Sequence, residues 1–381
     1  MSLSLGGCLS PLTLEKAALG YDQATTDTVS TQLLLNIARA HQHQPIHFTG
    51  ISNIAATFNF QFTVGATPAL TGSSGATMLP IFGSSLSENP TISMIPMEGE
   101  EFTKRLLAPF HENKLTMLLR QGVDIDLLLR LMTSEFRTLR DGTQAAYYNK
   151  PSDRRGYATF RRIVLHLSSI QDRNGLYFEP LLFERETILP AANLSAESLQ
   201  SLQQQNTLEY RADSNTYQFT RRHTGRILIT NYNPAALDNV ERQRLHELAD
   251  RSPHDEISVD IRPGYPGGEY PIQGTFRLRS FHNVLNFLGR SIDEEPEYDV
   301  NKDPRTPPVR ENPIHTMEIL ASASIPSNVD HVADLNDLSY AVKPDSGYQW
   351  NREAFRLLYQ LFQMTMTELP QFGTPSITIS K

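Results

Sequence analysis

The chain has 381 residues, a hydrophobic content of 39%, a charged content of 20% and a net charge of −8. This composition is typical of a folded globular protein with one large domain or two to three smaller ones, and the negative charge argues against general affinity for nucleic acid or anionic lipid headgroups. The sequence contains no run of about 18 apolar residues that would predict a membrane-spanning helix.

The first eleven residues, MSLSLGGCLSP, contain the only cysteine, Cys8. Leu5 lies three residues before it with small residues between, and this arrangement resembles the lipobox of bacterial lipoproteins. A secretory signal has a positively charged start and an apolar stretch of about 7–15 residues, whereas the seven residues before Cys8 are uncharged. The segment 1–11 therefore predicts either a lipid-bearing cysteine behind a shortened leader or a free thiol in an accidental match.

Residues 12–150 are predicted to be mainly helical around one amphipathic β-hairpin, which spans 54–97. The signals are apolar residues at helical spacing, an acidic first turn at Glu100 and Glu101, and Pro45 as a helix terminator. The expected elements are a helix at 12–40 that is weak in its Thr-rich middle, a strand at 54–64, a hairpin tip at 65–89, a strand at 90–97, and helices at 99–109, 111–121 and 123–140.

Strict alternation makes the strand at 54–64 the most distinctive element. One face carries Ile54, Ala56, Phe58, Phe60, Phe62 and Val64, and the other carries Ala55, Thr57, Asn59, Gln61 and Thr63. Three phenylalanines on one face of a strand must contact something apolar. The alternatives are a core that includes the helix at 123–140, lipid outside a β-barrel shared by subunits, or the sheet of a neighbouring chain. The core is the simplest interpretation, because burial of one phenylalanine contributes roughly 1.5–3 kcal/mol.

The remaining elements alternate irregularly, which favours an α+β fold with mixed helices and an antiparallel sheet over a doubly wound fold. In the α+β region 151–290 we expect helices at 153–171, 195–204, 234–250 and 280–290, and strands at 176–184, 207–211, 216–220, 226–231, 256–262 and 270–279. Residues 291–316 are rich in proline and acid and are predicted to be an exposed insertion. Residues 317–381 are expected to complete the fold with a strand at 338–343, a helix at 351–367 and a strand at 375–379.

Motifs for catalysis are absent from the sequence. It contains no nucleophile elbow, Walker A sequence or dinucleotide fingerprint, and the glycines of 262–271 are typical of a hairpin turn. Asp124 and Asp126 are interpreted as acids that favour a helix start rather than as a catalytic pair. Three arginine pairs are expected to bind the chain's own carboxylates, namely Arg154–Arg155, Arg161–Arg162 and Arg221–Arg222. No catalytic residue and no cofactor is predicted.

The histidines are the weak candidates for a metal site. His41, His43 and His47 lie within seven residues, and histidines two apart in an extended segment can bind zinc or copper. No carboxylate or cysteine lies nearby in the sequence, so a polar helix end is the simpler interpretation. His246 is expected on a solvated helix face.

Four blocks follow one another along the chain: GYDQATTDTVSTQLLLNIARAHQHQPIHFTGISNIAATF, ENPTISMIPMEGEEFTKRLLAPF, FRLRSFHNVLNFLGRSI and YAVKPDSGYQWNREAFRLLYQLFQMT. Their order resembles a family of uncharacterised bacterial outer-membrane lipoproteins, in which a Tyr-Asp pair precedes an LLLNI-R helix and a PT strand precedes GEEF. That family commonly has a longer leader and an aromatic-rich stretch where this chain has Tyr348 and Trp350. The resemblance implies a cell-envelope location on the periplasmic side of the outer membrane, with lipid on Cys8, and implies no reaction.

Together these observations predict a cell-envelope protein with a structural, assembly or export-related role and without catalytic activity. Its expected partners are further copies of itself, outer-membrane lipid through Cys8 and envelope proteins, but not nucleic acid, and the hairpin 54–97 is the interaction element. The alternative is an oligomeric outer-membrane channel whose subunits donate 54–97 to a shared β-barrel. An enzyme of unknown type is the third hypothesis.

Overall fold

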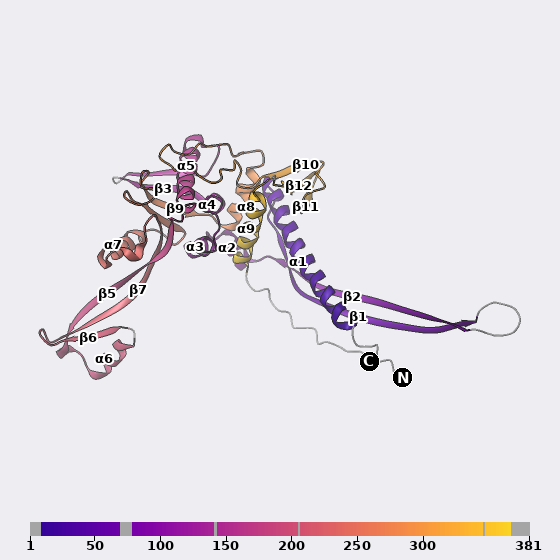
Figure 1. Ribbon diagram of the computed structural model, residues 1–381, viewed down its shortest axis with the longest axis horizontal. Helices are drawn as coiled ribbons and strands as arrows, with labels where there is room; N and C mark the ends of the chain where they lie inside the picture. The colour runs from indigo at the N-terminus through magenta and orange to yellow at the C-terminus, as the bar shows by residue number, and fades with distance from the viewer. Residues whose placement is uncertain (1–8, 69–77, 141–142, 205, 346, 367–381) are drawn as a thin grey trace. The chain divides into compact units, whose positions relative to one another are not determined.

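The computed structural model describes residues 9–68, 78–140, 143–204, 206–345 and 347–366 (Figure 1). The chain divides into two compact units. The larger unit comprises Leu33–Ile46 and Thr103–Thr365, and the described part of the smaller unit comprises residues 9–32, 47–68, 78–102 and 366. The boundaries expected near residues 150 and 290 therefore fall inside the larger unit.

The fold is α+β, as the sequence predicts. The helices are α1 (Leu9–His41), α2 (Glu100–Leu107), α3 (Glu112–Arg120), α4 (Ile125–Met132), α5 (Arg154–Gln171), α6 (Ala196–Gln203), α7 (Asn239–Ala249), α8 (Phe281–Arg290) and α9 (Trp350–Thr365). The strands are β1 (Phe48–Pro68), β2 (Met78–Met97), β3 (Thr133–Arg140), β4 (Thr143–Tyr148), β5 (Tyr177–Pro190), β6 (Thr207–Arg211), β7 (Thr216–Thr230), β8 (Glu256–Ile261), β9 (Ile272–Leu278), β10 (Ile319–Ser322), β11 (Val332–Leu335) and β12 (Leu338–Val342).

Helix α1 runs without interruption through its Thr-rich middle. The hydroxyl groups of Thr25 and Thr28 donate to the carbonyl oxygens one turn earlier, at 2.8 and 2.7 Å. These bonds satisfy the hydroxyl groups within the helix, so the threonines do not break it. The C-terminal part of α1 belongs to the larger unit, where its buried apolar residues are Leu33, Leu34, Ile37, Ala38 and Ala40.

The smaller unit contains the antiparallel pair of β1 and β2. Pairing runs from Phe48 opposite Met97 to Pro68 opposite Met78. The expected tip at 65–89 is therefore too long, since both strands continue into it. Glycine and serine are typical of loops, but their backbone groups join a ladder wherever a partner strand continues the register.

The larger unit is built on a seven-stranded sheet in the order β4-β3-β9-β8-β7-β5, with β6 paired to β7. Neighbouring strands are antiparallel except for β7 and β8, which are parallel. Helix α5 covers one face, where the ring of Phe160 lies 5.9 Å from that of Phe276 and Phe276 lies 4.7 Å from Phe136. The apolar stripe expected on α5 is buried: Phe160, Val164, Leu167 and Ile170.

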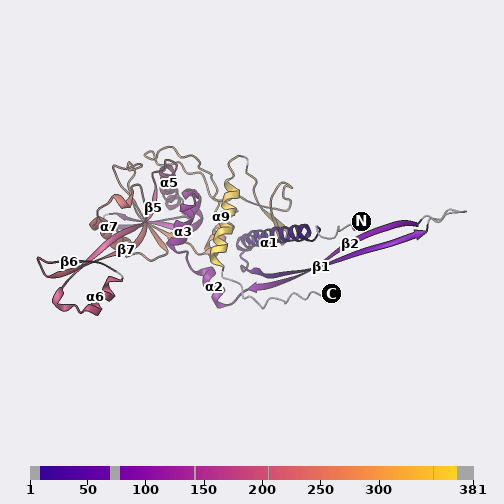
Figure 2. The same cartoon turned by 60° about the horizontal axis from the view of Figure 1, so that its bottom comes forward.

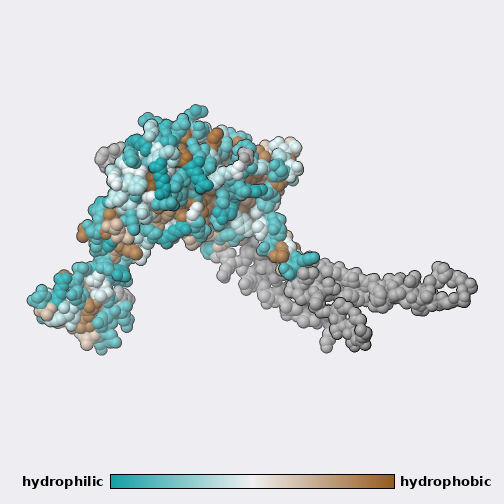
Figure 3. Space-filling view, in the orientation of Figure 1, coloured by the Kyte–Doolittle hydropathy of each residue, from teal (hydrophilic) through white to brown (hydrophobic). Residues whose placement is uncertain are grey.

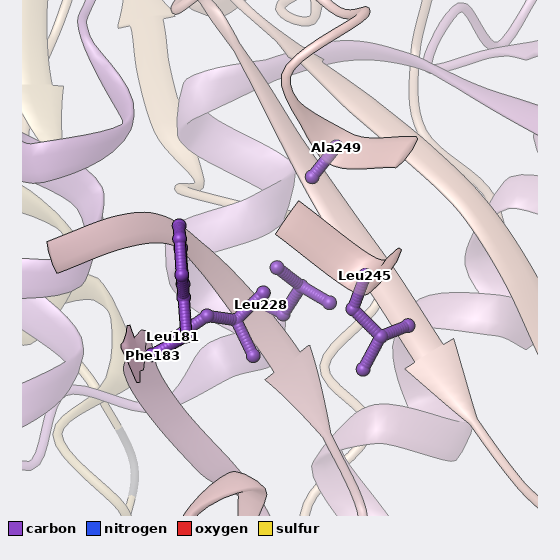
Figure 4. Close-up of a cluster of buried hydrophobic side chains, with 5 residues drawn as sticks. All are labelled: Leu181, Phe183, Leu228, Leu245 and Ala249. Atoms are coloured by element: carbon purple, nitrogen blue, oxygen red, sulfur yellow. The ribbon is translucent and has the colours of Figure 1, made fainter. Parts of the chain in front are cut away.

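Helix α7 packs against β5 and β7. The buried cluster there consists of Leu181, Phe183, Leu228, Leu245 and Ala249 (Figure 4). The prediction that His246 lies on a solvated face is wrong: its ring lies 4.9 Å from that of Phe183, and its Nδ1 accepts the backbone N–H of Arg226 at 3.2 Å. The polar sequence around His246 hid this contact, because it is made with a strand distant along the chain.

The helix expected at 123–140 ends at Met132, and the chain continues as β3. The Asn149 amide donates to the carbonyl oxygens of Arg130 and Thr133 at 2.8 and 2.9 Å. The guanidinium of Arg279 also donates to the carbonyl oxygen of Arg130, at 2.9 Å. These donors satisfy the carbonyl groups at the helix end, and they come from residues that a local apolar pattern does not include.

Strand β7 is one strand where the sequence predicts two, at 216–220 and 226–231. Residues 221–224 also pair with β5, which itself runs to Pro190 instead of ending at residue 184. The polar run RRHT looked like a break between strands. It forms part of the ladder because cross-strand backbone bonds do not depend on apolar side chains.

The C-terminal part contains a three-stranded sheet in the order β10-β12-β11, of which only β12 was expected. Helix α9 follows, and the ring of Phe362 lies 5.7 Å from that of Phe281 in α8. Lys114 of α3 donates to the carbonyl oxygen of Met364 at 2.6 Å, so α3 and α9 lie side by side (Figure 2). The strand expected at 375–379 lies outside the described residues.

Residues 291–316 are not simply an exposed insertion. Several of their side chains are buried, namely Ser291, Glu297, Val300, Thr306 and Thr316. Proline and acid are typical of exposed segments, but here one acid, Glu297, is buried and forms an ion pair with Arg130 inside the larger unit.

Candidate functional site

The residues predicted to contact lipid or a neighbour, Phe58, Phe60, Phe62 and Val64, all lie in β1, of which the structure describes the backbone. Their side chains, and Cys8, lie outside the described residues. What the structure adds is the register of β1 against β2. The amphipathic character of the hairpin and the lipid on Cys8 stay predictions.

The register sorts the residues of β1 and β2 into two sets, because opposite residues of an antiparallel pair share a face. The first set pairs Phe58 with Glu88, Phe60 with Leu86, Phe62 with Ser84 and Val64 with Phe82. The second set pairs Thr57 with Asn89, Asn59 with Ser87, Gln61 with Ser85 and Thr63 with Gly83. The first set is mainly apolar, whereas the second contains only polar residues and glycine. The two-sided pattern of β1 therefore continues across β2.

Sequence reasoning missed this continuation because it sought the second strand only at 90–97. The signal lay in residues 82–88, FGSSLSE, where Phe82 and Leu86 are separated by an even number of positions. Their glycine and serine neighbours are typical of a loop, so the alternation is visible only once the register of the hairpin is known.

The outer edges of the hairpin are the second feature of this site. In the part of the chain that the structure describes, β1 and β2 form a two-stranded sheet, so each strand has a partner on one side only. An edge strand presents a row of N–H and C=O groups that can pair with a further strand. At the start of β1 the Gln32 side chain of α1 accepts the backbone N–H of Thr49 at 2.8 Å and donates to its carbonyl oxygen at 3.0 Å. Pairing with another chain is therefore open only to the parts of the two edges beyond this point.

The histidines bind separate partners. His41 lies 2.8 Å from the hydroxyl of Tyr340 through Nδ1 and 3.0 Å from a carboxylate oxygen of Asp293 through Nε2. His43 lies 2.6 Å from a carboxylate oxygen of Glu294. Among the described residues, no three His, Cys, Asp or Glu side chains are arranged to hold a metal ion.

A buried ionic network holds residues 291–316 against α4 and α5. Glu297 accepts hydrogen bonds from the guanidinium of Arg130 and the hydroxyl of Tyr157, both at 2.9 Å. It also accepts the backbone N–H and the hydroxyl of Thr316, at 2.5 and 2.9 Å. Burial raises the pKa of Glu297, but Arg130 and Thr316 outweigh burial and lower it, so the carboxylate is charged. All these partners are internal, which indicates a structural role.

A cleft of about 730 Å³ opens where the start of α4, the end of α5, the segment around Arg310 and the residues before α9 meet. Asp124 lies in it as the N-cap of α4 and accepts the backbone N–H of Asp126 at 2.8 Å. Burial and the nearby charge of Asp126 raise the pKa of Asp124 to about 6. Arg310 donates its backbone N–H to Asp172 at 2.8 Å, and its guanidinium lies 5.9 Å from the ring of Tyr348.

The two aspartates of α4 have different roles. The N-cap bond of Asp124 agrees with its interpretation as an acid that favours the helix start. Asp126 goes beyond that interpretation, because it is buried and forms an ion pair with the guanidinium of Arg161, which is also buried. Arg161 was expected to pair with a carboxylate, but the sequence could not identify which one.

The cleft has the size and one of the chemical features of a small-molecule site. A carboxyl group that titrates near pH 6 can donate or accept a proton at neutral pH. The described residues that line the cleft include no serine, threonine, cysteine, histidine or lysine, so no pair of the serine–histidine or cysteine–histidine type forms among them. An enzyme therefore stays the third hypothesis, and the residues that line the cleft do not identify a reaction.

The described residues form an α+β protein with the antiparallel pair of β1 and β2 and a charged cleft. Comparisons with protein-family models, with curated proteins and with solved structures find no match to the chain. None of the described helices combines the length and hydropathy needed to cross a bilayer. The resemblance to bacterial lipoproteins stays a prediction.

Proposed function

We propose that the chain is a non-catalytic cell-envelope protein with a structural, assembly or export-related role, and that it forms homo-oligomers through β1 and β2. The observation that carries this proposal is a ladder of strands of 21 and 20 residues that forms a two-stranded sheet in the described part of the chain. Attachment to outer-membrane lipid through Cys8, on the periplasmic side, belongs to the same proposal and rests on the lipobox-like start and the family resemblance.

The open edges support assembly because of their length. At about 3.3 Å per residue, a strand of 20 residues extends for roughly 65 Å. A two-stranded ladder is marginally stable in water, and pairing into a larger sheet stabilises it. The edge of a neighbouring copy supplies that pairing by strand addition, with backbone hydrogen bonds along the whole contact.

A channel is the second candidate, and the register of the hairpin favours it. In a shared β-barrel the set with the phenylalanines would face lipid, and the set with Asn59 and Gln61 would face water. About eleven residues tilted by about 45° cross roughly 25 Å, the height of an apolar membrane band. The alternating segment 54–64 has that length.

The proposal is tested by the mass of the full chain in buffer and in detergent, measured by light scattering. The test variant carries Phe58→Ser, Phe60→Ser and Phe62→Ser. The matched control carries Thr57→Ser, Asn59→Ser and Gln61→Ser, which places three serines in the same strand but in the other set of the register.

Three outcomes distinguish the candidates. A detergent-dependent oligomer that the phenylalanine variant loses and the control keeps supports the channel. An oligomer in buffer that is lost in the same way supports assembly in water. A wild-type monomer in both media, or an oligomer that neither variant weakens, contradicts the proposal.

A further inference from the structure

The ladder of β5 and β7 extends beyond α7 as a segment, residues 184–222, that we call the arm (Figure 1). Strand β6 pairs with β7 there, and helix α6 of the arm has no buried residue. Large apolar side chains are exposed on the arm and next to it: Leu182 at 58%, Ile188 at 53% and Tyr210 at 51%. Figure 3 shows hydrophobic positions on the arm among mainly hydrophilic ones. Exposed apolar surface of this kind is typical of a segment that contacts a partner.

Two arginines lie opposite each other in the arm. The register places Arg185 of β5 directly opposite Arg221 of β7, and both are exposed. Like charges at opposite positions destabilise a sheet. In the part of the chain that the structure describes, neither guanidinium has a carboxylate oxygen within 4.0 Å, although the sequence predicted that Arg221 binds an acid.

The neighbouring register step shows the ordinary arrangement. Glu184 lies opposite Arg222, and their side chains form an ion pair at 3.1 Å. The prediction of an acid partner therefore holds for Arg222. The two steps lie in the same two strands but on opposite faces of the sheet. Backbone pairing of the ladder does not require two arginines at one step, so the Arg185–Arg221 step is not explained by the ladder.

A third basic group adjoins the pair. His223 lies two residues after Arg221, and its ring stacks on that of Phe183 at 5.6 Å. The guanidinium of Arg185 lies 5.5 Å from the same ring of Phe183. The pKa of His223 is lowered by loss of hydration and by the charges of Arg185 and Arg221. An anion placed here would relieve the repulsion among these groups.

In the described part of the chain, no carboxylate of the same copy lies within 4.0 Å of Arg185 or Arg221, and nearly all acids of the chain belong to that part. Only three acidic side chains lie outside the described part of the chain, namely Glu88, Asp141 and Glu368. The surplus of carboxylates, 42 against 34 lysines and arginines, therefore lies within the described part. Glu247 and Asp299 are examples of exposed acids there with no basic side chain within 4.0 Å.

We propose that Arg185 and Arg221 form a docking site for carboxylates on a second copy of this chain. Copies with a net charge of −8 repel one another, and an interface that sets unmatched arginines against unmatched acids offsets this repulsion. Opposite residues have Cβ atoms about 4.5–5.5 Å apart, so one carboxylate can accept from both guanidinium groups. This inference rests on the proposed homo-oligomer and names a contact outside the hairpin.

The test is self-association of the full chain, measured by sedimentation at low and high salt. Arg185→Glu creates a complementary pair with Arg221, like that of Glu184 with Arg222. The variant chain should melt at the same or a higher temperature than the wild type. Its association should be weaker by about tenfold or more and should lose most of its salt dependence. Arg185→Gln is a second variant that removes the charge without adding an acid.

The matched control exchanges the charges of the neighbouring step by Glu184→Arg with Arg222→Glu. This change keeps one acid opposite one base, so both melting and association should stay as in the wild type. Folding of each variant is checked by the fluorescence of Trp350, the only tryptophan and a buried one.

The outcomes separate this inference from the proposed function. Unchanged association and salt dependence of Arg185→Glu overturns the docking site, and the hairpin proposal stands if the phenylalanine variant still dissociates. Weaker association of Arg185→Glu together with an unaffected phenylalanine variant supports the docking site and overturns the hairpin interface. A wild-type chain that stays monomeric at every concentration overturns both.

Discussion

The β1–β2 ladder and the β5–β7 ladder are both long and antiparallel, but they are held in different ways. Strand β7 also pairs with β8, and the base of its ladder contributes Leu181 and Leu228 to a buried cluster with α7. The β1–β2 ladder forms a sheet of its own within the described residues. Buried side chains and a further strand stabilise the base of the β5–β7 ladder, whereas the described residues of the β1–β2 ladder show backbone pairing and a buried Phe48 at its start.

This difference predicts that stability is concentrated in the larger unit. Its buried apolar and ionic groups stabilise it, whereas the described contacts of the β1–β2 ladder are its backbone pairing and Phe48, which is buried at its start. Backbone hydrogen bonds are worth little net because water competes for the same groups. Trp350 of α9 reports on the larger unit, since its indole N–H donates to the carbonyl oxygen of Thr316 at 3.1 Å.

The largest effect is expected from Glu297→Gln. It removes the nearer of the two carboxylates beside the buried Arg130, that of Glu297 at 2.9 Å, and leaves Asp126 at 3.9 Å. Removal of one member of a buried ion pair costs about 3–5 kcal/mol. The measurement is denaturant unfolding followed by Trp350 fluorescence at pH 7. Glu247→Gln, an exposed change on α7, should stay within about 0.5 kcal/mol of the wild type. A loss below about 1 kcal/mol for Glu297→Gln would show that the network does not stabilise the unit.

A smaller, pH-dependent effect is expected from Asp124→Asn. The folded-state pKa of Asp124, about 6, lies above its ordinary value of 3.8, so the folded chain binds this proton more tightly than the unfolded chain. The resulting stability is complete below about pH 4 and is lost as the pH rises through about 6.

Asparagine keeps the N-cap acceptor and does not titrate. The free energy of unfolding of the variant relative to the wild type should therefore rise by about 1–3 kcal/mol between pH 4 and pH 7. Unfolding at a series of pH values, again followed by Trp350, measures this difference. A difference that is constant with pH would mean that the pKa of Asp124 is the same in the folded and the unfolded chain.

The smallest effect on the larger unit is expected from the triple change of Phe58, Phe60 and Phe62 to serine. If the hairpin is held by its own ladder and by neighbouring copies, the Trp350 transition should move by less than about 0.5 kcal/mol at protein concentrations where the chain is monomeric. A loss of several kcal/mol would identify the phenylalanines as core residues, which was the simplest interpretation of the sequence.

The role of Phe58, Phe60 and Phe62 as the interaction element stays a prediction. The sequence predicted the strand that carries them, because a period of two is visible in one strand alone. It did not identify residues 82–88 as the partner strand, since glycine and serine hide the alternation. The Arg185–Arg221 step was invisible, because opposition across a ladder depends on a register that no local pattern encodes.

The sequence by itself determined the elements whose signals are local. The apolar stripe of α5 is buried as its spacing predicts, and the turn between β8 and β9 contains Gly264 and Gly267 with positive φ angles of 85° and 75°, which glycine adopts without strain. These features depend on residues within a few positions of one another, so they can be predicted from the sequence alone.

Only the tertiary structure decided where α4 stops, that Glu297 is buried and charged, and which arginines face each other on the arm. The first depends on Asn149 and Arg279, and the second on Arg130 and Thr316, which supply hydrogen bonds from distant parts of the chain. The hydrogen bonding of a buried carbonyl group and the charge of a buried carboxylate depend on the donors that the fold brings to them. Packing determines which donors these are, and neighbours in the sequence do not.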